Sequence, residues 1–352
     1  MRIAFTYADL NGLDVWAADV QNAFLQAPCS GKYFTVCGPE FDSEFIGKLA
    51  LNIRAAYGLK STGADFRNHL RNCMEHLGYE YCKSDPDVWM RSATRIDGLD
   101  YYEYILLYVY DCLCISENPK PALLQVEKYF PIKPASLGPP KTYLGGTVSK
   151  IQLPNGIHAW AFSSLQYVHE AVKSVEEHLE KEDKKLMSKK LDTPIPTSYS
   201  PDLDITPEQI SIDAAYYQSL VGILRWIVEL GRVDICLEAS LISSHLALPR
   251  EVHLDKLFHI FVYLNWKHRA RMIFDPTYPS IYNDGLPRHD WEKHYGEVKE
   301  VIPTNAPVSR GKGFDMIGYV HADLAGDKVI RRSRTGFVIY LNQGTIYLFS
   351  QG

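Results

Sequence analysis

The stretch YILLYVYDCLCIS, residues 104–116, is the part of the chain from which its fold is best deduced. Two apolar, β-prone runs lie on either side of Tyr110-Asp111, a pattern that predicts a β-hairpin. A carboxylate is an unusual residue in what otherwise looks like buried strand. A second apolar strand, LDVWAADV (13–20), also ends next to a carboxylate, at Asp19.

Asp19 and Asp111 are therefore the first candidates for a functional site. Carboxylates at the ends of apolar strands can converge on one point and hold divalent cations, and Mg²⁺ prefers hard oxygen ligands. Two such ions, about 3.5–4 Å apart, catalyse phosphoryl transfer in many enzymes. The alternative is that both aspartates only cap turns, and these two residues alone do not separate the two interpretations.

The composition is that of a globular protein. The 352 residues suffice for about two domains, with 46% hydrophobic and 22% charged residues. The net charge of −5 excludes a wholly basic nucleic-acid binder but not a locally basic groove. Two basic segments, KHRAR (267–271) and RRSR (331–334), could contact phosphates, although solvated surface is the simpler interpretation.

The cysteines and the N-terminus bear on the cellular compartment. The seven cysteines form no C-x-x-C pair, and Cys112 and Cys114 share one face of a predicted strand as core residues. Reduced thiols fit the cytosol or the nucleus. There is no signal-peptide pattern and no apolar run of about 18 residues, so we expect no membrane span and no secretion. We also expect Met1 to lead directly into a strand, and both ends to be cut through folded structure.

Hydrophobic periodicity predicts a mixed α/β (α+β) chain. A helix over 61–77 places Phe66, Leu70, Cys73 and Leu77 on one face and ends at Gly78. Asp85-Pro86-Asp87 reads as a turn. TYLGG (142–146) and HAWAF (158–162) are strand candidates, and 314–352 contains three strands, the last two joined around Asn342-Gln343-Gly344. Further helices are expected over 164–181, 213–230, 233–247 and 250–267.

Successive blocks of the sequence resemble copia-type retrotransposon reverse transcriptases. The C-terminal GYVHADLAGDKVIRRSRTG (318–336) resembles the start of that family's ribonuclease H domain. The other blocks are DVWAADVQNAFLQAP (14–28), YGLKSTGADFRNHL (57–70), SDPDVWM (84–90), YILLYVYDCLCIS (104–116), TYLGG (142–146) and YYQSLVGILRWIVELGRVDI (216–235).

The resemblance implies the architecture of a right-hand polymerase. Residues 1–160 would form the palm and part of the fingers, and 161–274 a helical thumb and connection. Residues 275–313 would be a linker, and 314–352 a truncated ribonuclease H-like segment. We expect part of the fingers to be missing before Met1, and the remaining ribonuclease H ligands to lie beyond Gly352.

The implied reaction is RNA-directed DNA synthesis, a nucleotidyl transfer that uses an RNA or DNA template-primer, deoxynucleoside triphosphates and Mg²⁺ or Mn²⁺. Asp19 matches the first palm aspartate of the family, and Asp111 matches the second aspartate of its Y-V-D-D motif. Tyr110 stands at the position of the lost first aspartate of that doublet. A phenol with a pKa near 10 is neutral at pH 7, so we expect metal binding and turnover to be impaired.

The resemblance also implies secondary sites. Gly58 and Lys60 would lie near the nucleotide or template, and Gly145 near the primer end; a solvated turn and a plain strand end are the alternatives. In the ribonuclease H segment, His321 stands where the family has its first acidic ligand, with Asp323 close by. We expect no working ribonuclease H.

The family context implies that the chain is part of a Pol polyprotein, located in a cytoplasmic virus-like particle or in the nucleus. The alternative is a protein without catalysis: a domesticated or decaying remnant that at most binds nucleic acid or a partner.

Overall fold

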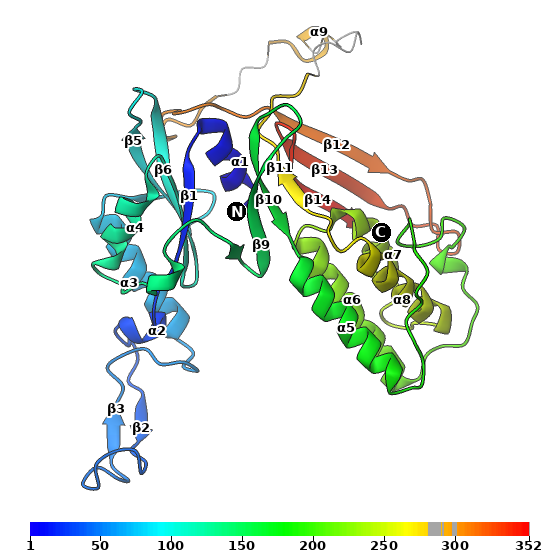
Figure 1. The fold of residues 1–352 in the computed structure, drawn as a ribbon, viewed down its shortest axis with the longest axis horizontal. Coiled ribbons are helices and arrows are strands. Elements are labelled where there is room, and N and C mark those ends of the chain that lie inside the picture. The colour runs from blue at the N-terminus through cyan, green and yellow to red at the C-terminus, as the bar shows by residue number, and fades with distance from the viewer. Residues whose placement is uncertain (281–289, 291, 298–300, 352) are drawn as a thin grey trace. The chain divides into compact units, whose positions relative to one another are not determined.

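The computed structural model describes residues 1–280, 290, 292–297 and 301–351 of a mixed α+β chain (Figure 1). The chain divides into two compact units. The first contains Met1, Leu10–Pro140 and Asp290–Lys312, and the second contains Arg2–Asp9, Lys141–His289 and Gly313–Gly352. The expected boundary after residue 160 falls inside a strand of the second unit, and the functional boundaries of the four predicted segments stay predictions.

A five-stranded antiparallel sheet forms the centre of the first unit. Its strand order is β1-β7-β6-β5-β4. The four residues between Asp14 and Asp19 in the edge strand β1 are all apolar, and Val15 and Ala18 are buried. The strands are β1 (Asp14–Asp19), β4 (Glu80–Tyr81), β5 (Val88–Thr94), β6 (Asp100–Tyr108) and β7 (Asp111–Ser116).

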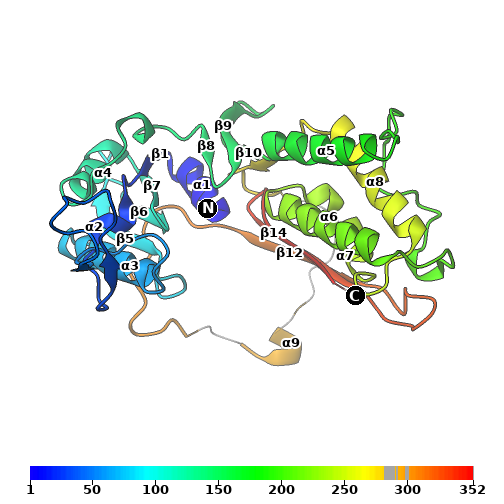
Figure 2. The ribbon, with the colours of Figure 1, turned by 90° about the horizontal axis from the view of Figure 1, so that it is seen from below.

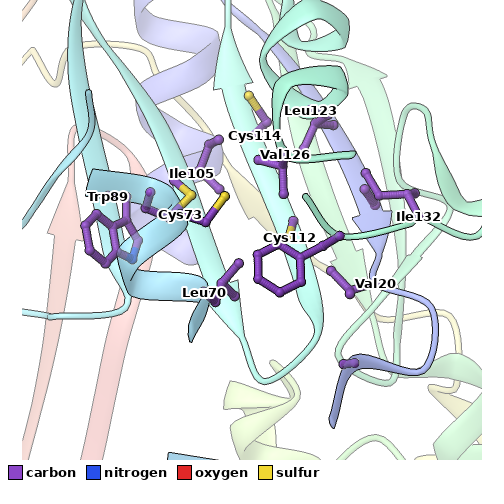
Figure 3. Close-up of a cluster of buried hydrophobic side chains, with 14 of the residues drawn as sticks. Val20, Leu70, Cys73, Trp89, Ile105, Cys112, Cys114, Leu123, Val126 and Ile132 are labelled. Atoms are coloured by element: carbon purple, nitrogen blue, oxygen red, sulfur yellow. The ribbon is translucent and has the colours of Figure 1, made fainter. Parts of the chain in front are cut away.

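Helices α3 (Thr62–His76) and α4 (Pro119–Glu127) cover one face of this sheet. Phe66 and Leu70 of α3 pack in one cluster with Cys112 and Cys114 of β7, and α4 adds Leu123 and Val126 (Figure 3). Full burial of such side chains stabilises a fold by about 1.5–3 kcal/mol each. The helix predicted over 61–77 and the core position of the two cysteines are confirmed.

The smaller elements of the first unit lie outside this core. A two-stranded ribbon, β2 (Phe34–Val36) with β3 (Leu49–Leu51), has exposed side chains on both strands. α2 (Ala23–Gln26) follows β1 in the chain and contacts α3, and the 3₁₀ turn η1 (Pro134–Ser136) contacts β1. The predicted turn at Asp85-Pro86-Asp87 is confirmed, because the Asp85 carboxylate accepts the Asp87 N–H at 3.0 Å.

The second unit contains two antiparallel sheets. One has the order β11-β10-β9-β8 and the other the order β12-β13-β14. The three strands predicted within 314–352, including the turn near Asn342-Gln343, are confirmed. The strands are β8 (Thr142–Tyr143), β9 (Gly146–Gln152), β10 (His158–Ser163), β11 (Met272–Phe274), β12 (Met316–Ala322), β13 (Thr335–Leu341) and β14 (Gly344–Gln351).

The N-terminal residues form helix α1 (Arg2–Asn11), so the expected strand after Met1 is wrong. Phe5 and Ala8 have no exposed surface, and their spacing matches one face of a helix. The Phe5 ring lies 5.5 Å from Phe274 and 5.3 Å from Trp160, so packing against the sheet stabilises the helix.

Four helices pack around a second core (Figure 2). The helices predicted over 164–181, 213–230 and 250–267 are confirmed, whereas 233–247 is a 3₁₀ turn followed by a shorter helix. The elements are α5 (Leu165–Glu180), η2 (Pro201–Leu203), α6 (Ser211–Glu229), η3 (Val233–Ile235), α7 (Cys236–Ser243) and α8 (Glu251–Trp266).

The predicted connection 275–313 lies partly outside the described residues, and its described part includes the one-turn helix α9 (Glu292–Tyr295). Among the helices that the structure describes, none has both the length and the apolar character required to traverse a lipid bilayer.

Candidate functional site

Asp19 and Asp111 lie side by side at one end of the five-stranded sheet. Asp19 is the last residue of β1 and Asp111 is the first residue of β7, and the two are direct partners in the antiparallel register. Cβ atoms of such partners are about 4.5–5.5 Å apart. The two aspartates that the sequence singled out are therefore brought together by the strands that carry them.

The turn that precedes Asp111 consists of Val109 and Tyr110. Tyr108 pairs with Asp111, so the hairpin is confirmed, but its two turn residues lie one position earlier than Tyr110-Asp111. Val109 has a φ of 56°, a left-handed conformation that β-branched residues rarely adopt. The Tyr110 carbonyl accepts the Val20 N–H at 3.0 Å, which ties the turn to the end of β1.

A segment that the sequence analysis did not single out, residues 131–138, runs along the other edge of β1. Ile132 forms a bridge with Val20, and Gly138 forms one with Ala17. The Lys133 N–H donates to the Asp19 carbonyl at 2.9 Å, and the Asp19 N–H donates to Ser136 Oγ at 2.9 Å. Asp19 is thus fixed by β7 on one side and by this segment on the other.

Lys133 forms an ion pair with Asp19. Its Nζ lies 2.6 Å from Asp19 Oδ2 and 6.0 Å from the centre of the Tyr110 ring. No local signal in the sequence marked this lysine, because the contact joins residues far apart in the chain. It lies between Ile132 and Pro134, six residues after the last residue of α4.

The ionisation of Asp111 depends on its surroundings. Burial, followed by the negative charge of Asp19, raises the pKa of Asp111, while Lys133 opposes the shift. The hydrogen bond to Asp19 is the largest cause that raises the pKa of Lys133. The other oxygen of Asp19, Oδ1, is buried and has no hydrogen-bond partner among the described residues. The site therefore holds two acidic groups and one lysine, which is paired with Asp19.

This donor set does not fit a centre for two divalent cations. Asp19 and Asp111 are its carboxylates, and Lys133 already occupies one oxygen of Asp19. Tyr110, the neighbour of Asp111, is 38% exposed and adds no carboxylate to the two aspartates. Over the described ranges of the chain, no three His, Cys, Asp or Glu side chains group as ligands for one metal ion.

Gly58 and Lys60 lie in the loop before α3. Gly58 has a φ of 94°, which explains the glycine by backbone conformation. In the part of the chain that the structure describes, no hydrogen bond or ion pair joins Lys60 to either aspartate. Gly145 lies in the second unit, in the turn between β8 and β9, with a φ of 81°. The roles of these three residues stay predictions.

His321 and Asp323 belong to the second unit. His321 is exposed on β12 and pairs with Gly336. Asp323 closes the loop between β12 and β13: its Oδ1 accepts the Arg334 N–H at 2.5 Å, and its own N–H donates to the Arg334 carbonyl at 3.0 Å. The Arg334 guanidinium also donates to Ser240 Oγ of α7 at 2.5 Å. Asp323 therefore has a structural role in this loop.

Two transposon-encoded proteins are similar to the chain. A transposon Ty5-1 protein of Saccharomyces cerevisiae is 28% identical over 252 residues, which cover 70% of this chain and 74% of that protein. The retrovirus-related Pol polyprotein from transposon RE1 of Arabidopsis thaliana is 24% identical over 332 residues, 93% of this chain but only 19% of that polyprotein. No protein-family model matches the chain. The two similarities support a retrotransposon origin.

Proposed function

We propose that this chain is the reverse transcriptase region of a copia-type retrotransposon Pol polyprotein, with an impaired polymerase site. The observation that carries the proposal is the direct pairing of Asp19 and Asp111 at the end of a strand and at a hairpin. Two aspartates in that arrangement are what a metal-dependent nucleotidyl transferase needs from its palm. The similarity to a Pol polyprotein adds independent support.

The elements of the two units suit the parts of such a polymerase. The sheet β1-β7-β6 with α3 and α4 would form the palm. Helices α5, α6, α7 and α8 would form the thumb and connection, and β12, β13 and β14 would begin the ribonuclease H-like segment. The substrates would be an RNA or DNA template-primer and deoxynucleoside triphosphates, and the rest of the polyprotein would be the partner.

The proposed impairment follows from the side chains around Asp111. Tyr110 brings no negative charge to the place of a metal-binding aspartate, and the Lys133 ammonium lies 2.6 Å from the Asp19 carboxylate. Every 1.36 kcal/mol of lost transition-state stabilisation lowers the rate about tenfold. We therefore propose a very low polymerase activity, and no ribonuclease H activity because His321 replaces an acidic ligand and Asp323 holds a loop.

Primer extension tests the proposal. The unmodified chain, Tyr110→Asp and a control, Tyr129→Asp, would be compared on poly(rA)/oligo(dT) with Mg²⁺ or Mn²⁺; Tyr129 is an exposed tyrosine of the same unit. We expect extension by Tyr110→Asp alone. Efficient synthesis by the unmodified chain would contradict the impairment. A folded Tyr110→Asp variant that neither binds template-primer nor extends it would contradict the polymerase assignment.

A second candidate function is nucleic-acid binding without catalysis. Arg269 and Arg271 are exposed in the KHRAR segment, and the structure shows no ion pair for either within its described residues. Unpaired arginines at a surface are suited to phosphate contacts, which weaken as salt increases. Filter binding of single-stranded RNA and DNA at increasing salt distinguishes a chain that binds nucleic acid from one that does not. Binding that is absent even at low salt would exclude this candidate.

A further inference from the structure

We infer that Lys133 serves as a built-in counter-cation for the Asp19–Asp111 pair, at the place where a polymerase of this kind would hold a divalent ion. This inference rests on the proposed function, because only a polymerase origin makes a divalent ion the expected partner of the two aspartates. It deepens that proposal by naming what balances the charge of the site in this chain.

The position of the ammonium group is the first argument. Lys133 Nζ lies 2.6 Å from Asp19 Oδ2, the distance of a charge-assisted hydrogen bond. The carboxylate that it neutralises is the direct cross-strand partner of Asp111. A single positive charge therefore lies beside two neighbouring carboxylates, as a bound metal ion would.

The backbone around Lys133 is the second argument, because it limits how far the lysine can withdraw. The Lys133 N–H donates to the Asp19 carbonyl at 2.9 Å, and the Ser136 hydroxyl accepts the Asp19 N–H and donates to the Lys133 carbonyl at 2.7 Å. An ordinary surface pair has no such anchoring and contributes little. Here backbone hydrogen bonds hold Lys133 and Asp19 next to each other independently of the ion pair between their side chains.

Tyr110 is the third argument. The Lys133 Nζ lies 6.0 Å from the centre of the Tyr110 ring, within the range in which an aromatic face attracts a cation. The residue that removes a metal ligand therefore also favours the lysine. A divalent ion that approached Asp19 would meet an ammonium repelling it and one carboxylate oxygen already occupied.

The first experiment measures direct Mn²⁺ binding by the electron paramagnetic resonance signal of free Mn²⁺. The proteins are the unmodified chain, Lys133→Met, Lys133→Arg, the control Lys120→Met, Tyr110→Asp and the double variant Tyr110→Asp/Lys133→Met. Lys120 is an exposed lysine of α4 in the same unit. We expect Lys133→Met to bind Mn²⁺ at least about 10-fold more tightly than the unmodified chain, because the variant lacks the positive charge that repels the ion and occupies Asp19 Oδ2.

Lys133→Arg and Lys120→Met should bind Mn²⁺ as weakly as the unmodified chain, and the double variant should bind it most tightly. Equal Mn²⁺ affinity of Lys133→Met and the unmodified chain would overturn the inference. If the double variant binds Mn²⁺ tightly but does not extend a primer, the polymerase assignment fails while the counter-cation role of Lys133 stands.

A second measurement, thermal unfolding in EDTA, needs no metal and covers the case in which Lys133→Met is too unstable for binding studies. We expect Lys133→Met to lower the melting temperature of the unmodified chain but not of an Asp19→Asn variant, whose side chain has no charge to balance. An equal decrease in both backgrounds would show that Lys133 stabilises the fold without acting on Asp19, and would overturn the inference.

Discussion

Asp19 and Asp111 are direct partners across β1 and β7, and their backbone positions are fixed by hydrogen bonds that do not involve their carboxylates. The backbone hydrogen bonds that position the two aspartates are therefore independent of the ionisable groups of the site. A substitution at Tyr110 or Lys133 changes charge without changing the register of the strands.

Val109→Gly should stabilise the chain. Val109 has a φ of 56°, and a β-branched residue in this region costs about 1–3 kcal/mol. Glycine removes that strain but loses more entropy on folding, about 0.5–1 kcal/mol. We expect a net gain of about 1 kcal/mol in the free energy of unfolding, measured by urea denaturation. Val36→Gly, on an exposed strand residue with an ordinary φ, is the control and should be destabilising; a loss of stability in Val109→Gly would disprove the strain.

Arg91→Met should be strongly destabilising. Arg91 Nη2 lies 2.7 Å from Glu103 Oε1, and Glu103 is buried and also accepts the Tyr79 hydroxyl. Removal of the arginine leaves a buried charge without its counterion, which costs about 3 kcal/mol. Urea denaturation of Arg91→Met and of Arg91→Met/Glu103→Leu would measure this, and the double variant should recover most of the loss.

Arg71→Met is the matched control for that experiment, because Arg71 and Glu75 form an exposed pair one helical turn apart in α3. It should leave the denaturation midpoint unchanged. A double variant as unstable as Arg91→Met alone would mean that Arg91 acts through packing on the Tyr79 ring and not through the charge of Glu103.

Asp234 should make stability depend on acid pH. Burial disfavours its ionised form, but two hydrogen bonds from Arg232, at 2.8 and 2.7 Å, and the charge of that buried arginine hold the pKa of Asp234 below its ordinary value. Its contribution to folding is therefore complete above the unfolded pKa of about 3.9 and is lost as the pH falls through the lowered folded pKa.

Asp234→Asn should consequently cost about 3 kcal/mol at neutral pH, because it leaves Arg232 buried without a counterion. The difference from the unmodified chain should begin to shrink below about pH 4, where the carboxylate of the unfolded chain binds a proton, and should level off once the pH has fallen through the lowered native pKa. Urea denaturation at a series of pH values measures both quantities. A difference that stays constant down to the lowest pH would show that Asp234 does not titrate as described.

The thiols should divide into two reactivity classes. All seven cysteines are free; Cys112 and Cys114 are buried, whereas Cys29 and Cys82 are partly exposed. Burial raises the pKa of Cys112 to about 12 and the pKa of Cys114 well above its ordinary value. Mass mapping after brief labelling of the native chain should find Cys29 and Cys82 modified first. Rapid labelling of Cys112 would show that the core beneath α3 opens readily.

Periodicity was sufficient for the elements with strong amphipathic patterns. α3 and α5 follow from apolar spacing, and the convergence of Asp19 and Asp111 follows from their placement at strand ends. The N-terminal helix was missed because its apolar residues pack on the distant Trp160 and Phe274, contacts that no local pattern reveals. Packing of this kind overrides local propensity.

The partners of the candidate site could not be predicted for a similar reason. Lys133 and Ser136 reach Asp19 from a segment more than a hundred residues further along the chain. The turn was misplaced by one residue because a valine with left-handed φ contradicts the residue preferences from which turns are predicted. The role of Asp323 in a ribonuclease H remnant stays a prediction, and its hydrogen bond from the distant Arg334 N–H, which closes a loop, is a contact that no local pattern reveals.

The exposed position of Tyr110 in a tight turn has an evolutionary consequence. Aspartate and tyrosine codons differ by a single base, and the turn accommodates the larger side chain with 38% of the residue exposed. A single base change can therefore exchange tyrosine and aspartate at position 110, in either direction, while the strands of the sheet stay paired. An exchange between these two residues therefore disturbs the fold little in either direction.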